Sequence, residues 1–310
     1  MSWVKKGLVY APSQKYDWNQ SHAQVPVVDI FNEKIWRIYY SSRDKNNISR
    51  TSFIEVEAGN PENILYEHSS PILDLGRPGT FDDCGIMPTC IINSGKGNEK
   101  YLYYIGWTKP ESLPYKNAIG IAVTEDGIHF RKMFETPVLA YNQNEQYFCG
   151  TAYVIKEKLW RMWYLSCIKW EMIDGKQEPY YNIKYAESED GINWKREESV
   201  AIELKNGNEG GLVSAAVVKE NDSYKMWYGM RSANGYRTHI EKSYRIGFAE
   251  SENGISWTRK DEAAGIDISK KGWDSEMISY PYIVTYKEKK YLFYNGNGFG
   301  RSGFGYAVYE

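Results

Sequence analysis

Four carboxylates recur at similar places in this 310-residue sequence, each a short distance ahead of an apolar stretch. Asp83, Glu145, Glu209 and Glu276 each lie five residues before one recurring position, and Ser21 occupies their place in the first copy. Paired carboxyl groups can do catalytic work together, one acting as a general acid and the other as a base or nucleophile. If the four meet around one opening, their crowding would raise the pKa of at least one of them, as a general acid requires. The sequence therefore predicts a catalytic pair among these residues; the alternative is that they cap loop amides or bind a neighbouring Arg or Lys.

A histidine accompanies these acids. His22 follows Ser21 directly, and of the four histidines in the chain it alone lies beside the recurring position. An imidazole can act as a general acid or base near neutral pH, and it can also orient a ligand. We therefore expect His22 to assist the carboxylates.

Large aromatic and basic residues recur in a second set of loops. The loops over 105–117, 166–181 and 229–243 are long, and length combined with unusual chemistry on one face favours binding. Tryptophan rings stack on sugar faces, and arginine binds a carboxylate or phosphate through paired hydrogen bonds. The predicted substrate-binding residues in these loops and their counterparts are Arg43, Trp107, Trp170, Arg231 and Arg301. The basic residues indicate an anionic ligand, such as a uronic or nonulosonic acid, a sugar phosphate or a nucleotide sugar, unless Arg43 and Arg231 only neutralise the acids.

The elements that must position these residues repeat along the chain. An aromatic stretch occurs five times, as 36-WRIYY-40, 101-YLYYI-105, 160-WRMWY-164, 224-YKMWYG-229 and 291-YLFYNG-296. A polar turn and a further apolar stretch precede each copy, and a third motif recurs as 126-DGIHFRK-132, 190-DGINWKR-196 and 253-NGISWTRK-260. Short strands separated by turn residues, with a period of about 60 residues, indicate four-stranded propeller blades rather than helical repeats.

The two ends of the chain complete the same repeat. The last copy stops at 304-FGYAVYE-310 without an outer strand, while 2-SWVKK-6 is similar to 256-SWTRK-260. We therefore expect residues 2–6 to form the outer strand of the last blade, which leaves no open sheet edge between the first and last blades. The predicted fold is an all-β, five-bladed β-propeller with four-stranded blades, in a single domain over residues 1–310. In such a fold the loops that carry the acids and the loops that carry the Trp and Arg residues share one face.

These repeats resemble the five-bladed propeller glycosidases, namely glycoside hydrolase families 43 and 32 and their relatives. The resemblance rests on the S/T-E-D/N-G-I-x-W/F turns and on 272-GWDSEMISYP-281, and it covers the whole chain. It implies a carbohydrate-active enzyme of the glycoside hydrolase type that acts on a small or anionic glycan or an activated sugar. The closest positions to the catalytic acids of those families are not acidic here; they are Val25, Pro26, Met87, Pro88, Cys149 and Gly150. Any catalysis would therefore use the carboxylates upstream of them.

Composition narrows the class of protein further. The net charge is −2 and the mean hydropathy is −0.60, so neither nucleic acid nor a membrane is an expected partner. The four cysteines form no CxxC pair, and no metal-binding or phosphate-cradling motif occurs, so we expect neither a metal nor another cofactor. With no apolar signal at the start, this predicts a cytoplasmic protein that acts on a small molecule or oligosaccharide. Two alternatives stay open: a non-catalytic sugar-binding propeller, and glycosyl transfer or phosphorolysis in surface polysaccharide metabolism.

Overall fold

The computed structural model describes residues 2–310, apart from the side chains of residues 197 and 198. Regular structure in that part is almost entirely β-strand. The exceptions are the four-residue helix α1 (Asn297–Gly300) and two 3-10 turns, η1 (Ile240–Lys242) and η2 (Asp261–Ala263). No helix among these described residues is long and apolar enough to cross a membrane.

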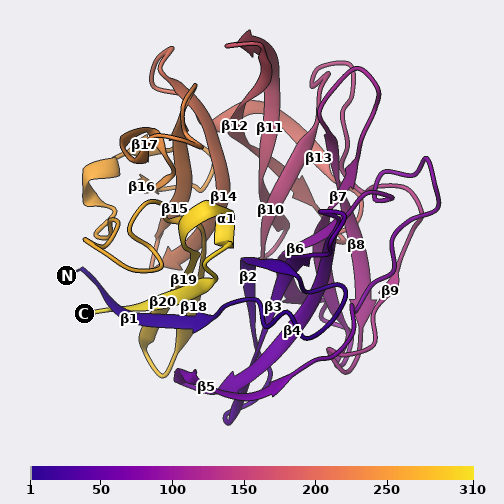
Figure 1. Cartoon of the computed structure of the whole chain (residues 1–310), viewed down its shortest axis with the longest axis vertical. Helices are drawn as coiled ribbons and strands as arrows, with labels where there is room; N and C mark the ends of the chain where they lie inside the picture. Colours follow the sequence, from indigo (N-terminus) through magenta and orange to yellow (C-terminus); the bar gives the residue numbers. More distant parts are fainter. Residues whose placement is uncertain (1) are drawn as a thin grey trace.

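Four-stranded units follow one another along the chain (Figure 1). The first sheet contains β2 (Ser21–Ile30), β3 (Ile35–Arg43), β4 (Ser49–Glu57) and β5 (Asn60–Glu67). The second contains β6 (Ile86–Asn93), β7 (Lys100–Thr108), β8 (Lys116–Thr124) and β9 (Arg131–Lys132). The last contains β18 (Ser279–Tyr286), β19 (Lys289–Asn295), β20 (Phe304–Tyr309) and, from the start of the chain, β1 (Trp3–Tyr10).

The remaining strands form an eight-stranded sheet that consists of two such units. One contains β10 (Cys149–Lys156), β11 (Trp160–Ile173), β12 (Lys176–Ser188) and β13 (Lys195–Ile202). The other contains β14 (Glu209–Glu220), β15 (Ser223–Ser232), β16 (Arg245–Ser251) and β17 (Thr258–Arg259). A single parallel pair, Tyr181 with Gly211, joins the two units. A β-carbon at Gly211 would lie 2.2 Å from the Tyr181 ring, so this close approach requires glycine.

The first strand of each unit lies near the middle of the molecule (Figure 1). Each of these strands contacts the next one, in the order β2, β6, β10, β14 and β18, and β18 contacts β2 in turn. Sheets that surround a common axis in this way are the arrangement of a β-propeller. The prediction of a nearly all-β propeller built of four-stranded sheets is thereby confirmed.

The two ends of the chain pair as the sequence predicts. β1 runs antiparallel to β20, with Trp3 opposite Tyr309 and Lys5 opposite Ala307. The Trp3 ring packs edge-on against Trp227 and Tyr309, with ring centroids 5.5 and 5.0 Å apart. The expectation that residues 2–6 form the outer strand of the last sheet is confirmed, and the strand continues to Tyr10.

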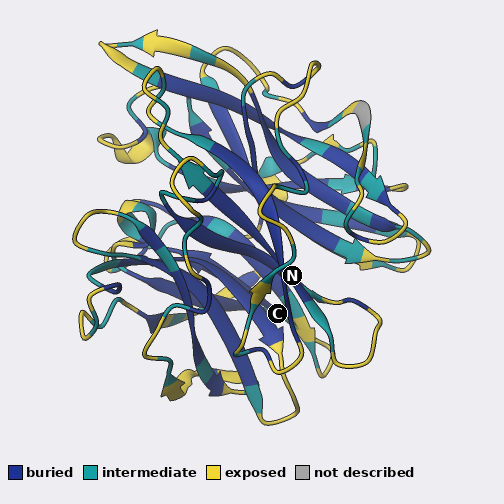
Figure 2. Ribbon diagram, turned by 90° about the vertical axis from the view of Figure 1, so that its right-hand side faces the viewer, coloured by how far each residue is buried: buried dark blue, intermediate teal, exposed yellow. Residues whose placement is uncertain are grey.

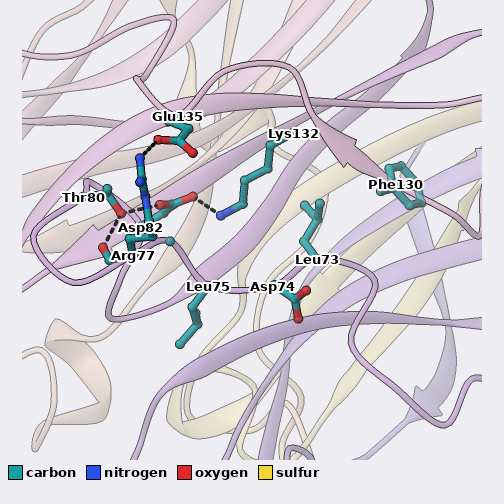
Figure 3. A pocket seen from close by; sticks show the side chains of 10 residues that line it. Leu73, Asp74, Leu75, Arg77, Thr80, Asp82, Phe130, Lys132 and Glu135 are labelled. Atoms are coloured by element: carbon teal, nitrogen blue, oxygen red, sulfur yellow. Dashed lines mark hydrogen bonds and ion pairs between the residues drawn. The ribbon is translucent and has the colours of Figure 1, made fainter.

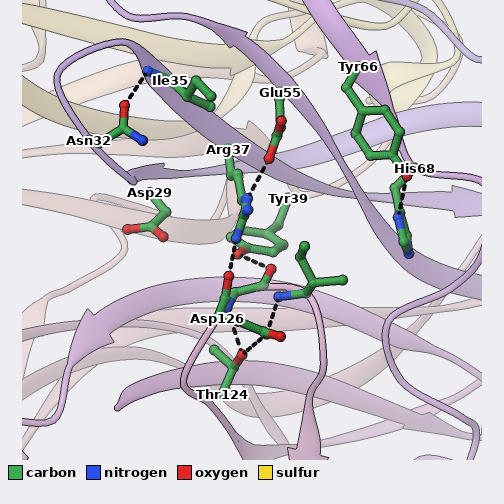
Figure 4. A network of polar contacts seen from close by, with 12 residues as sticks. Asp29, Asn32, Ile35, Arg37, Tyr39, Glu55, Tyr66, His68, Thr124 and Asp126 are labelled. Atoms are coloured by element: carbon green, nitrogen blue, oxygen red, sulfur yellow. Dashed lines mark hydrogen bonds and ion pairs between the residues drawn. The ribbon is translucent and has the colours of Figure 1, made fainter. Parts of the chain in front are cut away.

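The recurring Asp-Gly and Asn-Gly turns connect neighbouring sheets, which explains why the motif repeats. The Tyr39 hydroxyl donates to the Gly127 carbonyl at 2.7 Å, and Arg37 donates both to the Asp126 carbonyl and to Glu55 (Figure 4). The same position of the next two sheets repeats the contact: Tyr103 donates to Gly191 at 2.6 Å and Trp163 donates to Gly254 at 2.9 Å. Each of these turns is held by a strand of the preceding sheet, so the role of the motif is structural.

Aromatic side chains fill the space between the sheets. Figure 2 shows the strands buried along most of their length, with exposed residues concentrated in the loops and outer edges. The largest fully buried side chains are Trp36, Trp163, Tyr39, Tyr40, Tyr101, Tyr103, Tyr104, Tyr164, Tyr185, Tyr228, Tyr294 and Phe53. Most come from the five aromatic stretches, so the high aromatic content is used first for packing between sheets.

Candidate functional site

The loops at one end of the inner strands meet across the axis of the propeller. Arg43, at the end of β3, donates to the Gln24 side chain of β2 over 3.4 Å. Gln24 in turn contacts the sulfur of Met87 in β6 at 3.6 Å, and the Trp107 indole at the end of β7 donates to the same sulfur at 3.0 Å. The first two sheets are therefore linked through side chains close to the axis.

Aromatic residues continue this contact into the third sheet. Tyr115 lies with its ring 4.9 Å from Trp107, 5.3 Å from Phe148 and 5.3 Å from Trp170. Trp170 comes from the long hairpin of β11 and β12, which extends beyond the neighbouring strands (Figure 1). Trp107, Tyr115 and Trp170 are half-buried, so each residue keeps some exposed surface, although the Trp170 indole nitrogen is buried.

The last two sheets close the group. The Tyr244 ring lies 6.5 Å from Tyr280 and 5.8 Å from Phe299 of α1, and Phe299 also packs against Tyr236 at 6.4 Å. All five units therefore contribute to one region, which we call the axial mouth. Its members are His22, Gln24, Arg43, Met87, Trp107, Tyr115, Phe148, Trp170, Tyr236, Tyr244, Tyr280, Phe299 and Arg301.

His22 and two arginines form the basic part of the axial mouth. The His22 side chain is buried, and its Nδ1 lies 2.9 Å from the Ser21 hydroxyl. Burial, and then the positive charges of Arg43 and Arg301, lower the pKa of His22 to about 3. His22 is therefore neutral at physiological pH and can exchange hydrogen bonds there but cannot serve as a charged acid.

Glu145 does not point toward the other predicted acids but into its own sheet. It is buried, and it accepts hydrogen bonds from the hydroxyls of Tyr164 at 2.8 Å and Ser166 at 2.7 Å. Arg196 of β13 and Lys184 of β12 form ion pairs with it at 3.4 and 3.8 Å. Both carboxylate oxygens are thus engaged between strands.

Both carboxylate oxygens of Glu209 are also engaged by neighbouring groups. Arg259 of β17 binds it through two nitrogens, at 2.7 and 2.8 Å, and its Oε2 also accepts a hydrogen bond from the amide of Lys205. Arg259 binds Asp261 as well, at 2.8 Å, and Tyr228 donates to Asp261. This arrangement ties the outer strand to its loop, which corresponds to the alternative considered for these acids.

In three of the sheets an acid ahead of the inner strand binds a strand tyrosine. Asp82 binds Tyr104 and Lys132 at 3.1 and 2.6 Å. In the last sheet Asp274 binds Tyr294 and Lys5 at 3.0 and 2.6 Å. Glu145 belongs with these residues. The prediction that Glu145 shares one opening with the other acids is therefore wrong, because Glu145 occupies the position of Asp82 and Asp274.

The cause of this error is a bulge in the inner strands. Their common landmark is a bulge residue with positive φ, at Val25, Thr151, Ser214 and Tyr280. Glu145 lies six residues before its bulge, Glu209 five and Glu276 four, so the three acids are not equivalent. Sequence counting missed this because a bulge adds a residue to one strand without changing its apolar pattern. No hydrogen bond or ion pair joins any two of the four acids within the described side chains.

Asp83 differs from these two acids in having no cation partner among the described side chains. Its Oδ2 accepts a hydrogen bond from the Gly79 amide at 2.8 Å, and its Oδ1 is buried without a well-formed partner. Burial acts to raise the pKa of Asp83, but the Gly79 amide, and then the side chains of Cys84 and Thr108, outweigh it and leave the pKa below its ordinary value. The pKa rise expected from crowded acids is thus not found at Asp83, which stays ionised as a base or nucleophile must.

Glu276 is exposed at the edge of the axial mouth. It borders a cavity of about 90 Å³ together with Tyr236, Met277, Phe299 and His239. Its backbone is fixed, because its amide donates to the Asn297 side chain at 2.8 Å. No ion pair to its carboxylate exists among the described side chains. Asp83 and Glu276 are therefore the two predicted acids that the structure leaves free of cations.

Arg231 lies beside the axial mouth but its donors are already used. It donates to the Tyr181 hydroxyl at 2.8 Å and to the Pro179 and Ser232 carbonyls at 2.6 and 2.8 Å. Its guanidinium also lies 4.0 Å from the centre of the Tyr236 ring. The predicted substrate-binding role of Arg231 is therefore at odds with the structure, in which it fastens the β11–β12 hairpin to the β15 loop.

Sequence reasoning missed several members of the axial mouth. Gln24, Tyr115, Phe148 and Tyr280 all reach it, although none was singled out. Their signal was present in part, because Tyr115 lies in the long loop over 105–117 and Phe148 lies just ahead of an inner strand. Within the described residues, no group of three or more His, Cys, Asp or Glu residues is placed to hold a metal ion.

A second cavity lies away from the axial mouth, near the outer strand β9. It has a volume of about 270 Å³ and lies between Asp74, Arg77, Phe130 and Lys132 (Figure 3). Its acidic floor is Asp82, which already binds Lys132. The cavity draws on two sheets only, whereas the axial mouth draws on every unit.

Replacing Glu145 should test whether it has a structural role. Glu145→Gln would leave Arg196 and Lys184 without their buried carboxylate, so we expect the free energy of unfolding to fall by about 3 kcal/mol in urea denaturation. Glu135→Gln is a matched control, because Glu135 is an exposed partner of Arg77 and should change stability by less than about 0.5 kcal/mol. Unchanged stability of Glu145→Gln would contradict the structural role.

The buried imidazole of His22 predicts a loss of stability in acid. Since its pKa is about 3 in the folded chain and about 6.5 in an unfolded one, protonation favours unfolding as the pH falls from about 6.5 toward 3. His22→Asn removes this effect, and Asn tolerates the φ of 63° at this position. Urea denaturation at about pH 7 and pH 4 should show a smaller pH-dependent loss for the variant than for the parent. Equal losses would contradict the assignment.

The chain has relatives both in sequence and in structure. No protein-family model matches the sequence. Two sequence relatives, the uncharacterized proteins MT1551 and Rv1502 from two strains of Mycobacterium tuberculosis, are each 36% identical over 311 residues, covering 100% of both chains.

Solved structures show the fold that the sequence resemblance implied. A glycoside hydrolase has a TM-score of 0.72 at 19% identity, covering 99% of this chain and 91% of its own. A thermostable family-43 glycoside hydrolase has a TM-score of 0.67 at 16% identity, with coverages of 93% and 88%. A member of the GH130 family of mannoside phosphorylases, which contains glycoside hydrolases that target beta-1,2 mannosidic linkages, has a TM-score of 0.66 at 16% identity, with coverages of 100% and 94%. The resemblance to the propeller glycosidases is thus confirmed for the fold.

Proposed function

Because this chain belongs to the same family as MT1551 and Rv1502 of Mycobacterium tuberculosis and has the fold of propeller glycoside hydrolases, we propose that it is a carbohydrate-active enzyme of glycosidase type. The substrate, a small or anionic glycan, enters at the axial mouth. Residues 1–310 form one domain of five blades in this proposal, and the eight-stranded sheet makes up two of those blades.

The observation that carries this proposal is the composition of the axial mouth. Half-buried rings of Trp107, Tyr115 and Trp170 form one wall, and Arg43 and Arg301 provide positive charge near His22. Aromatic rings offer flat apolar surfaces to sugar faces, while arginine supplies directional donors to their oxygens. A site that combines the two is suited to a polar ring compound that carries negative charge.

Asp83 and Glu276 are the proposed catalytic carboxylates. A glycosidase needs one ionised carboxylate to activate water or attack the sugar and one protonated acid to assist the leaving group. The lowered pKa of Asp83 suits the first task. Glu276 is then the candidate acid, since it is the other predicted carboxylate without a cation partner among the described side chains and it borders the axial mouth.

Turnover of a panel of aryl glycosides and oligosaccharides tests this function. We expect release of a reducing sugar from at least one acidic or small glycan without added phosphate. Binding of a glycan without turnover would favour the non-catalytic sugar-binding alternative. Failure to bind any glycan at millimolar concentration would contradict the proposal.

Phosphorolysis is a second candidate because Arg43 and Arg301 could hold inorganic phosphate. In that reaction a phosphate oxygen attacks the sugar in place of water, so a single carboxylic acid suffices. Adding phosphate to the same panel distinguishes the two reactions. Formation of a sugar 1-phosphate would favour phosphorolysis, whereas hydrolysis that is indifferent to phosphate would count against it.

A further inference from the structure

Two arginines of the axial mouth have no carboxylate partner among the described side chains. Three buried or half-buried arginines do have one: Arg37 binds Glu55, Arg196 lies beside Glu145, and Arg259 binds Glu209. Buried Arg231 uses hydroxyl and carbonyl oxygens instead. Arg43 contacts only amide oxygens, those of Asn47 at 3.0 Å and Gln24 at 3.4 Å. No side-chain hydrogen bond or ion pair of Arg301 is found in this part of the chain. Arg43 is half-buried and Arg301 is exposed, so two positive charges lie at the axial mouth with no acid partner among the described side chains.

The backbone holds these two charges near each other against their repulsion. Arg43 lies opposite Ser21 in the pairing of β3 with β2, and burial above all, with a further contribution from Arg301, lowers the pKa of its guanidinium. Arg301 follows α1, which is packed on β2: a β-carbon at Gly300 would lie 2.5 Å from the Ala23 carbonyl oxygen. Phe299 has a φ of 61°, a strained value for a residue other than glycine. Such strain persists only where the surrounding structure imposes it.

Buried polar groups without partners lie on the first two strands of the first and last sheets. Ser41, Ser279 and Asn295 are fully buried, yet the Ser41 and Ser279 hydroxyls and the Asn295 Nδ2 have no hydrogen-bond partner. Ser41 pairs across the sheet with Gln24, and Asn295 pairs with Ser279. The Asn295 side-chain oxygen accepts a hydrogen bond from the Val25 amide at 2.8 Å, so its amino group is oriented. These enclosed groups surround Gln24 and Val25, and the Gln24 side chain is the one that Arg43 contacts.

We infer that Arg43 and Arg301 form a subsite for the acidic group of a sugar ligand. Arginine binds a carboxylate or phosphate through paired, charge-assisted hydrogen bonds. The inference deepens the proposed function and rests on it, because the aromatic wall of Trp107 and Trp170 would hold the ring of the same sugar. The ligand class is therefore a sugar with its own oxyanion, such as a uronic acid or a sugar phosphate.

Isothermal titration calorimetry with paired probes tests this subsite. The probes are glucuronate and galacturonate, their neutral parents glucose and galactose, glucose 6-phosphate, and inorganic phosphate. The variants are Arg43→Gln and Arg301→Gln, with Arg131→Gln as the matched control, since Arg131 is exposed on the outer strand β9. We expect at least one acidic sugar to bind about tenfold or more tightly than its neutral parent, and each mouth variant to weaken that binding about tenfold or more, because a charge-assisted bond contributes that much. Arg131→Gln should bind like the parent.

Each result separates the subsite from the proposed function. Equal binding of acidic and neutral sugars, or full acidic-sugar affinity in both mouth variants, overturns the subsite while leaving a carbohydrate-active mouth in place. Binding of inorganic phosphate alone, lost in Arg43→Gln, keeps an oxyanion site but overturns its assignment to a sugar-borne group; turnover of the glycan panel then still decides the proposed function. No binding of any anion by the folded parent overturns the subsite outright.

Discussion

Deleting residues 2–7 should unfold the chain or leave it far less stable than the parent. The deletion removes most of β1, including Trp3, which is buried against Trp227 and Tyr309, and Lys5, which binds the buried Asp274 at 2.6 Å. Loss of a buried tryptophan costs about 3–5 kcal/mol, and an unpaired buried carboxylate adds about 3 kcal/mol or more. The sum is comparable with the whole stability of an ordinary domain, about 5–15 kcal/mol. Urea and thermal denaturation of the purified proteins measure the effect.

A substitution on the exposed side of the same strand provides the control for that deletion. Val4→Thr alters a residue that is 37% exposed, so it should change the free energy of unfolding by less than about 0.5 kcal/mol. A truncated chain that melts at the same temperature as the parent would contradict closure of the last sheet by β1.

Asp83→Asn should abolish most of the turnover of any substrate found in the glycan panel. A base or nucleophile in this position contributes about 10²–10⁴-fold to the rate. The folded chain should tolerate the change to within about 1 kcal/mol, because an asparagine oxygen can still accept the Gly79 hydrogen bond. Rates at saturating substrate, together with urea denaturation, measure both parts of the prediction.

The neighbouring residue is the matched control for Asp83. Asp82 is buried between Lys132 and Tyr104, so Asp82→Asn should lower the free energy of unfolding by about 3 kcal/mol. The two adjacent substitutions should thus differ in effect. Asp83→Asn lowers the turnover rate, whereas Asp82→Asn lowers the free energy of unfolding. If Asp83→Asn retains full turnover, Asp83 is not the catalytic base.

Most of the fold could be predicted from the sequence, because the motifs that indicate its strands and turns are local and recur along the chain. Five aromatic stretches predicted the packed strands, and the Asp-Gly turns recur because Tyr39, Tyr103 and Trp163 each bind the turn of the next sheet. The match of 2-SWVKK-6 to 256-SWTRK-260 predicted strand β1 for the same reason. The position of a residue within the repeated blade is therefore nearly enough to predict whether it contacts the turn of the next sheet.

The candidate site was harder to predict than the fold, because the bulges in the inner strands decide which loop side chains reach the axial mouth. The bulges at Thr151 and Tyr280 shift the preceding loops, so Glu145 joins a buried network while Glu276 stays exposed, although simple counting made them equivalent. Arg231 could not be recognised as structural either, since its partners Tyr181 and Pro179 are distant in sequence. Spacing predicted which loops meet, and the structure was needed to show which side chains are free.

A structure of the chain with its tightest-binding glycan tests the central claim most directly. The account predicts the sugar in the axial mouth, with its ring against Trp107 or Trp170 and its acidic group on Arg43 and Arg301. A glycan held instead in the outer cavity beside Asp74 and Lys132 (Figure 3), with the axial mouth free of ligand, would contradict it.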